Sequence, residues 1–119
     1  LNIRIVHRAP NTTANTTLNG VAWDASKLRL SGTIVIEKLA QQTQSFLRES
    51  ILLLSPTAKA EAVPNLEILA NDVKCSHAAT ISNISDEQVF YLMSRGISKQ
   101  QAEELIVDGF LSFVVKSPA

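Results

Sequence analysis

The stretch AKAEAVPNLEILANDVKCSHAAT, residues 58–80, decides the fold that we expect, because small or apolar residues alternate in it with polar ones. Lys59, Glu61 and Glu67 share one parity in its first half, and the opposite parity is apolar. A period of two is typical of strands that bury one face, and it recurs over residues 28–37. We therefore expect extended strands in both stretches. The residues of the apolar parity are Leu28, Leu30, Ile34 and Ile36, followed by Ala58, Ala60, Ala62, Leu66, Ile68 and Ala70.

The organisation of the chain changes near residue 83. Before it, short strands are separated by turn-forming residues such as Asn19–Gly20 and Ser55–Pro56, and no amphipathic helix of useful length is visible. Strands at these intervals are compatible with a sandwich, a barrel or a β-solenoid. Internal sequence repeats are too weak to choose among these three architectures.

After residue 83 the pattern is helical. Ser85–Gln88 has the sequence of a capping box, and Val89, Leu92 and Met93 follow as an apolar stripe. Gly96 stands where helices commonly end with a positive φ. A second capping box, Ser98–Gln101, predicts another helix that continues through Gly109 to Phe113. The apolar stripe of this second helix is Ala102, Leu105, Ile106 and Phe110.

Composition limits the class of protein. A chain of 119 residues fits one domain or a fragment of one. Its 11 basic residues balance 11 acidic ones, which leaves no electrostatic footprint for nucleic acid or an anionic membrane. The longest apolar run, Ile51–Leu54, is too short to span a bilayer, and a single cysteine excludes an internal disulfide. The single cysteine indicates a reducing compartment. Because the chain opens without Met, we expect a C-terminal piece of a longer protein.

The motifs of common enzymes are missing from the sequence. It contains no Gly-rich phosphate loop, HExxH, GxSxG or EF-hand spacing, so we expect neither ATP binding by this chain alone nor an enzyme. A polysaccharide-acting enzyme on a β-solenoid is the rival from another class. It needs clustered carboxylates or calcium ligands, and the acidic residues here are scattered.

Cys75 and His77 are the candidate metal ligands. Two residues apart on a strand, they share a face and lie about 6.6 Å apart along it, so both can reach one soft or borderline metal ion. The neighbouring imidazole favours the thiolate form of Cys75. Two ligands do not complete a tetrahedral site, so the pair indicates either a site shared with other residues or no site at all.

A purely structural interpretation stands beside this one. Val73 and Ala79 share the face of Cys75 and His77, which suggests that this face is covered. Cys75 is then a small buried thiol, and His77 is bonded to a backbone carbonyl. The other histidine, His7, shares parity with apolar neighbours and is interpreted as a strand histidine half covered by them.

Several separated motifs resemble one family. Asp72–His77, with Ala79–Thr80 behind it, is similar to the DVKCSHGAT signature of the SufD branch of the SufB/SufD proteins, which are scaffold components of the SUF iron–sulfur cluster assembly machinery. The resemblance extends over nearly all of the chain. Its other motifs are His7, Ala9–Thr13, Ala40–Thr43, Leu52–Ser55, Pro64–Ile68, Phe90–Leu92 and Ser94–Ile97, the last two matching FYLRSRGI.

The resemblance implies a mainly β fold: the end portion of a right-handed parallel β-helix over residues 1–82, followed by a helical segment of two or three short helices over residues 83–119. It also implies a non-enzymatic scaffold in the bacterial cytoplasm or plastid stroma, pairing with a SufB-like subunit and binding a SufC-like ABC ATPase. A purely structural adaptor without metal chemistry is the alternative.

The resemblance implies site residues as well. His77, and with less weight Cys75, contribute to a transient iron–sulfur cluster at a subunit boundary of the full complex, while the isolated fragment carries none and can form a homodimer. Part of a helical set faces the ATPase: Phe90, Met93, Leu105, Ile106 and Phe110.

The chain departs from the family pattern at two places. Ala78 stands where the family has Gly, which costs about 1 kcal/mol if the position needs a positive φ and almost nothing in an extended strand. Phe46–Ser50 is the second departure, because the family tends to have more polar residues there, including Asn, before Leu52–Ser55.

Overall fold

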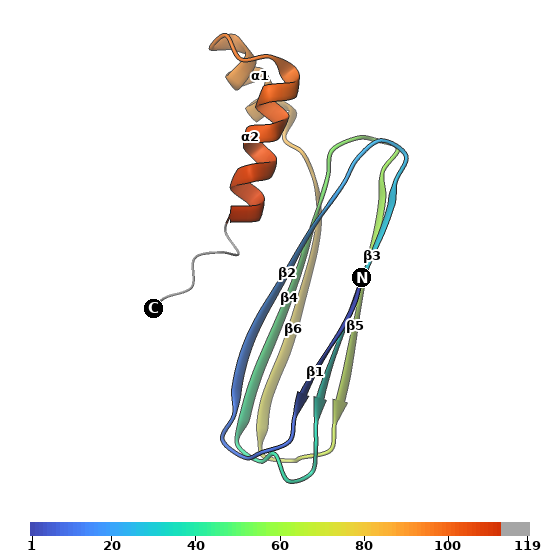
Figure 1. The fold of residues 1–119 in the computed structure, drawn as a ribbon, viewed down its shortest axis with the longest axis vertical. Coiled ribbons are helices and arrows are strands. Elements are labelled where there is room, and N and C mark those ends of the chain that lie inside the picture. Colours follow the sequence, from blue (N-terminus) through green and yellow to red (C-terminus); the bar gives the residue numbers. More distant parts are fainter. Residues whose placement is uncertain (113–119) are drawn as a thin grey trace.

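The computed structural model describes residues 1–112, in which six strands precede two helices (Figure 1). Within this part of the chain, neither helix has both the length and the apolar character needed to cross a bilayer. The strands are β1 (Asn2–His7), β2 (Thr13–Ala22), β3 (Lys27–Ile36), β4 (Thr43–Leu53), β5 (Lys59–Ile68) and β6 (Val73–Asn83), and the helices are α1 (Asp86–Ser94) and α2 (Lys99–Ser112).

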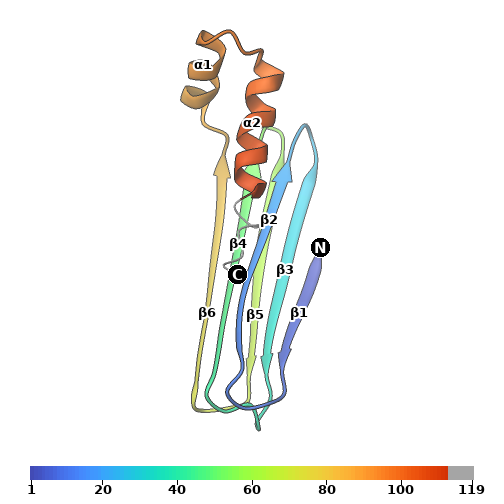
Figure 2. The same ribbon diagram turned by 60° about the vertical axis from the view of Figure 1, so that its left-hand side comes forward.

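The strands form two three-stranded parallel sheets, with the orders β1-β3-β5 and β2-β4-β6. The chain alternates between the sheets, so each strand pairs with the next but one, as in Ile5 with Ile34 and Leu18 with Glu49. Parallel neighbours need a long crossover connection. Here each crossover contains a strand of the opposite sheet, and the two sheets lie face to face (Figures 1 and 2).

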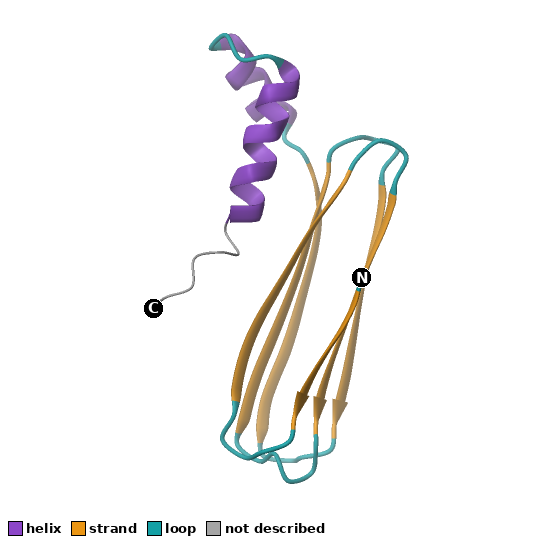
Figure 3. Ribbon diagram, viewed as in Figure 1, coloured by secondary structure: helices purple, strands orange, loops and turns teal. Residues whose placement is uncertain are grey.

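The expected mainly β architecture with a helical C-terminal segment is confirmed, but the expected right-handed parallel β-helix is wrong. Among the described residues the two sheets stay separate and no closed sheet forms. Each circuit of the chain supplies only two strands, and turns at the ends of the sheets connect them (Figure 3). Three of these turns contain a residue in the left-handed region: Asn11 at φ 60°, Asp24 at 54° and Gln42 at 59°. These turns carry the chain from one sheet to the other, and the strands of the two sheets do not pair with each other.

The core lies between the sheets. Ile34 and Ile36 of β3 pack with Leu47 of β4, and Ala40 and Ala70 join them from the turns. The alternation predicted for residues 28–37 is thus confirmed in the central strand β3. In the edge strand β5 the same parity is less covered: Leu66 is 45% exposed and Ile68 40% exposed.

Both predicted helix N-caps are present, and the second forms the complete capping box. The Ser85 hydroxyl accepts a hydrogen bond of 3.2 Å from the Gln88 backbone N–H. Ser98 and Gln101 bond reciprocally: the Ser98 hydroxyl accepts from the Gln101 N–H at 3.2 Å, and the Gln101 side chain accepts from the Ser98 N–H at 3.3 Å. Gly96 has the predicted positive φ, 90°. The second helix is described to Ser112, so the predicted extension to Phe113 lies outside the described residues.

The helices lie beyond one end of the strands. α1 follows β6, and α2 turns back alongside the edge strand β2 (Figures 1 and 2). The Asn19 side chain donates a hydrogen bond of 3.2 Å to the carbonyl of Phe110, which fixes α2 to β2. Val89 in α1 and Ala102 in α2 are the buried residues of the two helices. Much of their remaining apolar surface is therefore left open.

Candidate functional site

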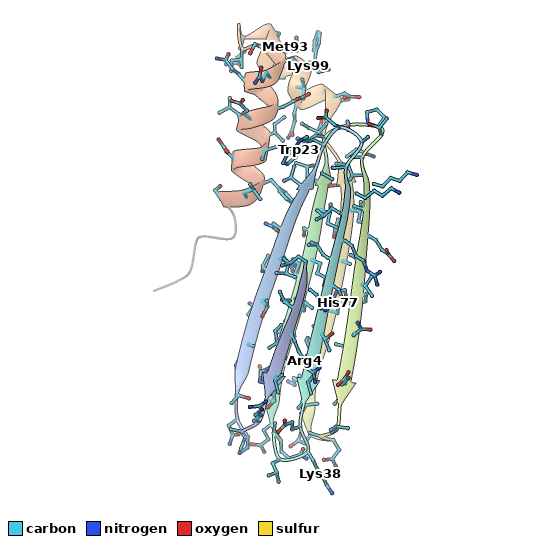
Figure 4. All side chains as sticks on the ribbon, turned by 45° about the vertical axis from the view of Figure 1, so that its right-hand side comes forward. Arg4, Trp23, Lys38, His77, Met93 and Lys99 are labelled. Carbon is cyan, nitrogen blue, oxygen red and sulfur yellow. The ribbon has the colours of Figure 1, made fainter. Side chains whose placement is uncertain are left out.

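Strand β6 turns both predicted ligands toward the interior. In the parallel register, Cys75 lies beside Ser45 and His77 beside Leu47, and both of these β4 residues are buried. Lys74, on the opposite face, is exposed. The shared face predicted for the two ligands is therefore confirmed, and Figure 4 shows His77 midway along the strands, remote from the helices.

Ala78 causes no strain in this strand. It lies within β6, and its φ is not among the positive values of the described residues. An alanine in extended backbone is tolerated at almost no cost. The first departure from the family pattern therefore leaves the backbone at His77 unchanged.

Glu49 of β4 is the neighbour of His77 that sequence reasoning missed. Its side chain is 0% exposed, and its Oε2 lies 3.8 Å from Nε2 of His77, whose side chain is 10% exposed. A separation of 3.8 Å is too long for a hydrogen bond. Among the described residues, neither carboxylate oxygen of Glu49 nor Nε2 of His77 has any hydrogen-bond partner.

Gly32 of β3 makes room for this carboxylate from the opposite sheet. A Cβ at residue 32 would lie 2.6 Å from Oε1 of Glu49 and 2.5 Å from Cδ2 of Leu47. Real Cβ atoms essentially never approach so closely, so only glycine fits without a shift. Glu49 falls in the second departure, Phe46–Ser50, and this was the one signal that could have pointed to it.

Burial governs the electrostatics of the site. It raises the pKa of Glu49 above its ordinary value, and the interaction with the His77 imidazole opposes this increase. Burial also raises the pKa of the Cys75 thiol. The protonated thiol is therefore favoured within this chain, in contrast to the thiolate that the sequence predicts.

His7 has a different environment. It is 6% exposed, and both ring nitrogens are hydrogen-bonded, Nδ1 to the Thr12 hydroxyl at 2.8 Å and Nε2 to the Ser45 hydroxyl at 3.0 Å. The Thr12 hydroxyl is also bonded to that of Thr43 at 3.1 Å. This network supports the structural interpretation of His7, with deeper burial than the sequence predicts.

The described residues do not complete a metal site on their own. Within residues 1–112, no three His, Cys, Asp or Glu side chains come close enough to hold one ion. Nitrogen and oxygen donors from His77 and Glu49 suit a borderline divalent metal, and the Cys75 sulfur suits softer ones. Any complete coordination sphere here needs water or ligands from outside this set.

The helical residues predicted to face a partner divide into two groups. Phe90, Met93 and Leu105 are 74%, 44% and 51% exposed. Ile106 and Phe110 are half-buried. A groove runs between the helices, lined by Glu87, Gln88, Tyr91, Leu92, Leu105, Ile106 and Gly109.

Comparison with known proteins identifies the family. Residues 1–110 match the model of the SUF system FeS cluster assembly, SufBD core domain. The chain is 41% identical to SufD of Escherichia coli over 90 residues, 76% of this chain and 21% of that protein. It is 32% identical over 108 residues both to SufB of Bacillus subtilis and to a SufBD family protein of Staphylococcus saprophyticus, in each case 91% of this chain and 23% of the relative. The chain thus spans under a quarter of the length of these relatives, and it belongs to the SufBD core-domain family of iron–sulfur cluster assembly proteins.

Proposed function

We propose that the chain is part of a SufD-like scaffold subunit, not an enzyme, that places ligands for iron–sulfur cluster assembly. The chain matches both branches, with 41% identity over 90 residues to SufD of Escherichia coli and 32% over 108 residues to SufB of Bacillus subtilis. The motif Asp72–His77 supports the SufD branch. A reducing compartment, the bacterial cytoplasm or the plastid stroma, suits this role.

His77, with Cys75 as the secondary candidate, contributes to a transient cluster in the complete complex. The single observation that carries this proposal is the His77 imidazole: it lies on the edge strand β6, and Nε2 has no hydrogen-bond partner among the described residues. An imidazole nitrogen with a free lone pair is a common metal ligand. Because residues 1–112 do not complete the site, the remaining ligands come from a neighbouring subunit.

A SufB-like subunit pairs with the open edge of β6. Parallel sheets end in edge strands with unpaired N–H and C=O groups, which are templates for a further strand. The last strand of each sheet, β5 in one and β6 in the other, is an edge strand. β5 contains Pro64, which has no N–H to donate, whereas β6 contains no proline. The edge that carries His77 is therefore the better one for pairing.

Without a SufB-like subunit, a second copy of the chain can occupy this edge. Light scattering after gel filtration tests this homodimer, and a clean monomer contradicts it.

Reconstitution tests the cluster proposal. The full complex containing His77→Ala is incubated anaerobically with iron and sulfide, and cluster absorbance is followed. We expect at least a tenfold loss with His77→Ala, a smaller loss with Cys75→Ala, and none with the matched control Lys74→Ala, on the exposed face of β6. Normal assembly in both the His77→Ala and Cys75→Ala complexes contradicts the proposal and favours a purely structural adaptor.

A SufC-like ABC ATPase docks on the helices. Phe90, Met93 and Leu105 supply exposed apolar side chains there, and Ile106 lines the groove between α1 and α2. Exposed apolar patches of this kind mark interaction surfaces. We expect Phe90→Asp and Leu105→Asp to abolish capture of the ATPase in a pull-down. Leu39→Asp, a residue 78% exposed in the turn between β3 and β4, is the control and should leave capture unaltered. Unaltered capture by both helix variants contradicts the docking surface.

A further inference from the structure

The buried carboxylate of Glu49 lacks the partners that such a group requires. Its side chain is 0% exposed, yet within the described part of the chain neither oxygen accepts a hydrogen bond. Burying an ionised carboxylate without a compensating charge or hydrogen bond is strongly unfavourable. Polar groups buried in native proteins are nearly always satisfied, so each exception calls for a physical explanation.

The basic side chains of residues 1–112 provide little of this compensation: the one ion-pair contact of Glu49 is with His77, at 3.8 Å and without a hydrogen bond. In the structure of residues 1–112, the arginine ion pairs join Arg4 to Glu67, Arg8 to Glu37 and Arg29 to Glu61, all on the surface. The one basic group within 4 Å of Glu49 among these residues is the His77 imidazole. Its Nε2 is itself unsatisfied, so three buried polar atoms of these two side chains lack a hydrogen-bond partner.

The separation of these atoms suits a metal ion between them. Histidine nitrogen and carboxylate oxygen each bind Zn²⁺ at about 2.0–2.2 Å. Two such ligands are about 3.4 Å apart at a tetrahedral angle and reach about 4.2 Å when they lie opposite each other. The observed 3.8 Å between Nε2 of His77 and Oε2 of Glu49 lies within this range. One divalent ion between them satisfies the imidazole and neutralises the carboxylate at once.

We propose that Glu49 and His77 form a binding site for a divalent first-row transition metal, such as Fe²⁺ or Zn²⁺, inside this single chain. The two protein ligands hold the ion, and water completes its coordination. Gly32 leaves space for the carboxylate, and His77 lies on the edge strand β6, with its side chain 10% exposed and its Nε2 atom buried. This metal site rests on the proposed function, because it takes His77 as a ligand. It adds Glu49 as the second ligand, so that the metal is bound before a second subunit is present.

Cobalt absorbance and zinc calorimetry on the 119-residue chain test this site. We expect the wild-type chain to bind one equivalent of Co²⁺, with visible bands of a four- or five-coordinate ion, and one equivalent of Zn²⁺. Glu49→Gln keeps the shape of the side chain and removes the charge, so affinity should fall at least tenfold. Glu61→Gln, a carboxylate 65% exposed on β5, is the matched control and should bind as the wild type does.

Two results overturn the inference: no binding by the wild-type chain, or undiminished binding by Glu49→Gln. A thermal melt shows that Glu49→Gln is folded, and His77→Gln serves as a second variant with the same expected loss. The cluster assay separates this inference from the proposed function. If Glu49→Gln and His77→Gln both lose metal binding while the His77→Ala complex assembles clusters normally, only the cluster role is refuted. If Glu49→Gln still binds metal while the His77→Ala complex loses its clusters, only the metal site proposed here is refuted.

Discussion

The two histidines of the chain both lie between the sheets, and they differ in what surrounds them. His7 has a hydroxyl partner on each ring nitrogen, at 2.8 and 3.0 Å. His77 has a buried carboxylate at 3.8 Å and, among the described residues, no hydrogen bond at Nε2. Buried polar groups that have hydrogen-bond partners help to specify a fold. An imidazole and a carboxylate that both lack such partners can instead bind a ligand that the described residues do not supply. The contrast is the one expected if His7 has a structural role and His77 is the metal ligand that we propose.

The largest expected effect is on stability at His7. His7→Ala removes a buried ring and leaves the hydroxyls of Thr12 and Ser45 without it, so the free energy of unfolding should fall by about 2–4 kcal/mol. His77→Ala removes a ring with an unsatisfied nitrogen, and we expect less than half of that loss. Urea unfolding of both variants in EDTA measures the difference. Equal losses contradict the contrast between the two histidines.

A smaller effect is expected at Gly32, which faces the His77 side of the interior. Gly32→Ala places a Cβ 2.6 Å from Oε1 of Glu49 and 2.5 Å from a methyl of Leu47, so we expect a loss of about 1–3 kcal/mol and weaker Zn²⁺ binding. Gly109→Ala is the matched control, because a Cβ at this position of α2 meets nothing within 4 Å. It should stabilise the chain by up to about 1 kcal/mol. If Gly32→Ala changes neither the free energy of unfolding nor the Zn²⁺ affinity, the Glu49 side chain does not pack against β3.

The smallest effect is a pH dependence that belongs to Glu49 alone. Because burial raises its folded pKa above the ordinary 4.5, the folded chain retains a proton that the unfolded chain releases. Its contribution to stability is therefore complete below pH 4.5 and is lost as the pH rises through the folded pKa. The titratable group that faces this carboxylate is the His77 imidazole. In EDTA, the difference in unfolding free energy between wild type and Glu49→Gln should fall over this window, and a flat difference contradicts the burial of the charge.

Local features of the fold could be predicted from the sequence. The period-two alternation places Cys75 and His77 on one face of β6, and the two capping boxes locate the starts of α1 and α2. These features depend on residues close together in the chain, where strand and helix geometry translate sequence directly into position.

Features that depend on distant pairing could not be predicted. Which strands pair with one another depends on contacts between distant parts of the chain, whereas the period-two pattern of a strand shows only which of its faces is buried. The β-helix that the family resemblance implies therefore had to be corrected. Glu49 was missed for the same reason: a glutamate in a strand is normally solvated, and only the register of β4 against β6 brings it to His77.

Nuclear magnetic resonance of the two imidazoles tests the central claim most directly. In the chain labelled with ¹⁵N-histidine, long-range proton–nitrogen spectra report each ring nitrogen separately while Zn²⁺ is added to one equivalent. We predict that Nε2 of His77 shifts to the range of a metal-bound nitrogen while both nitrogens of His7 keep their hydrogen-bonded positions. A spectrum in which His77 does not respond, or in which His7 responds equally, contradicts the account.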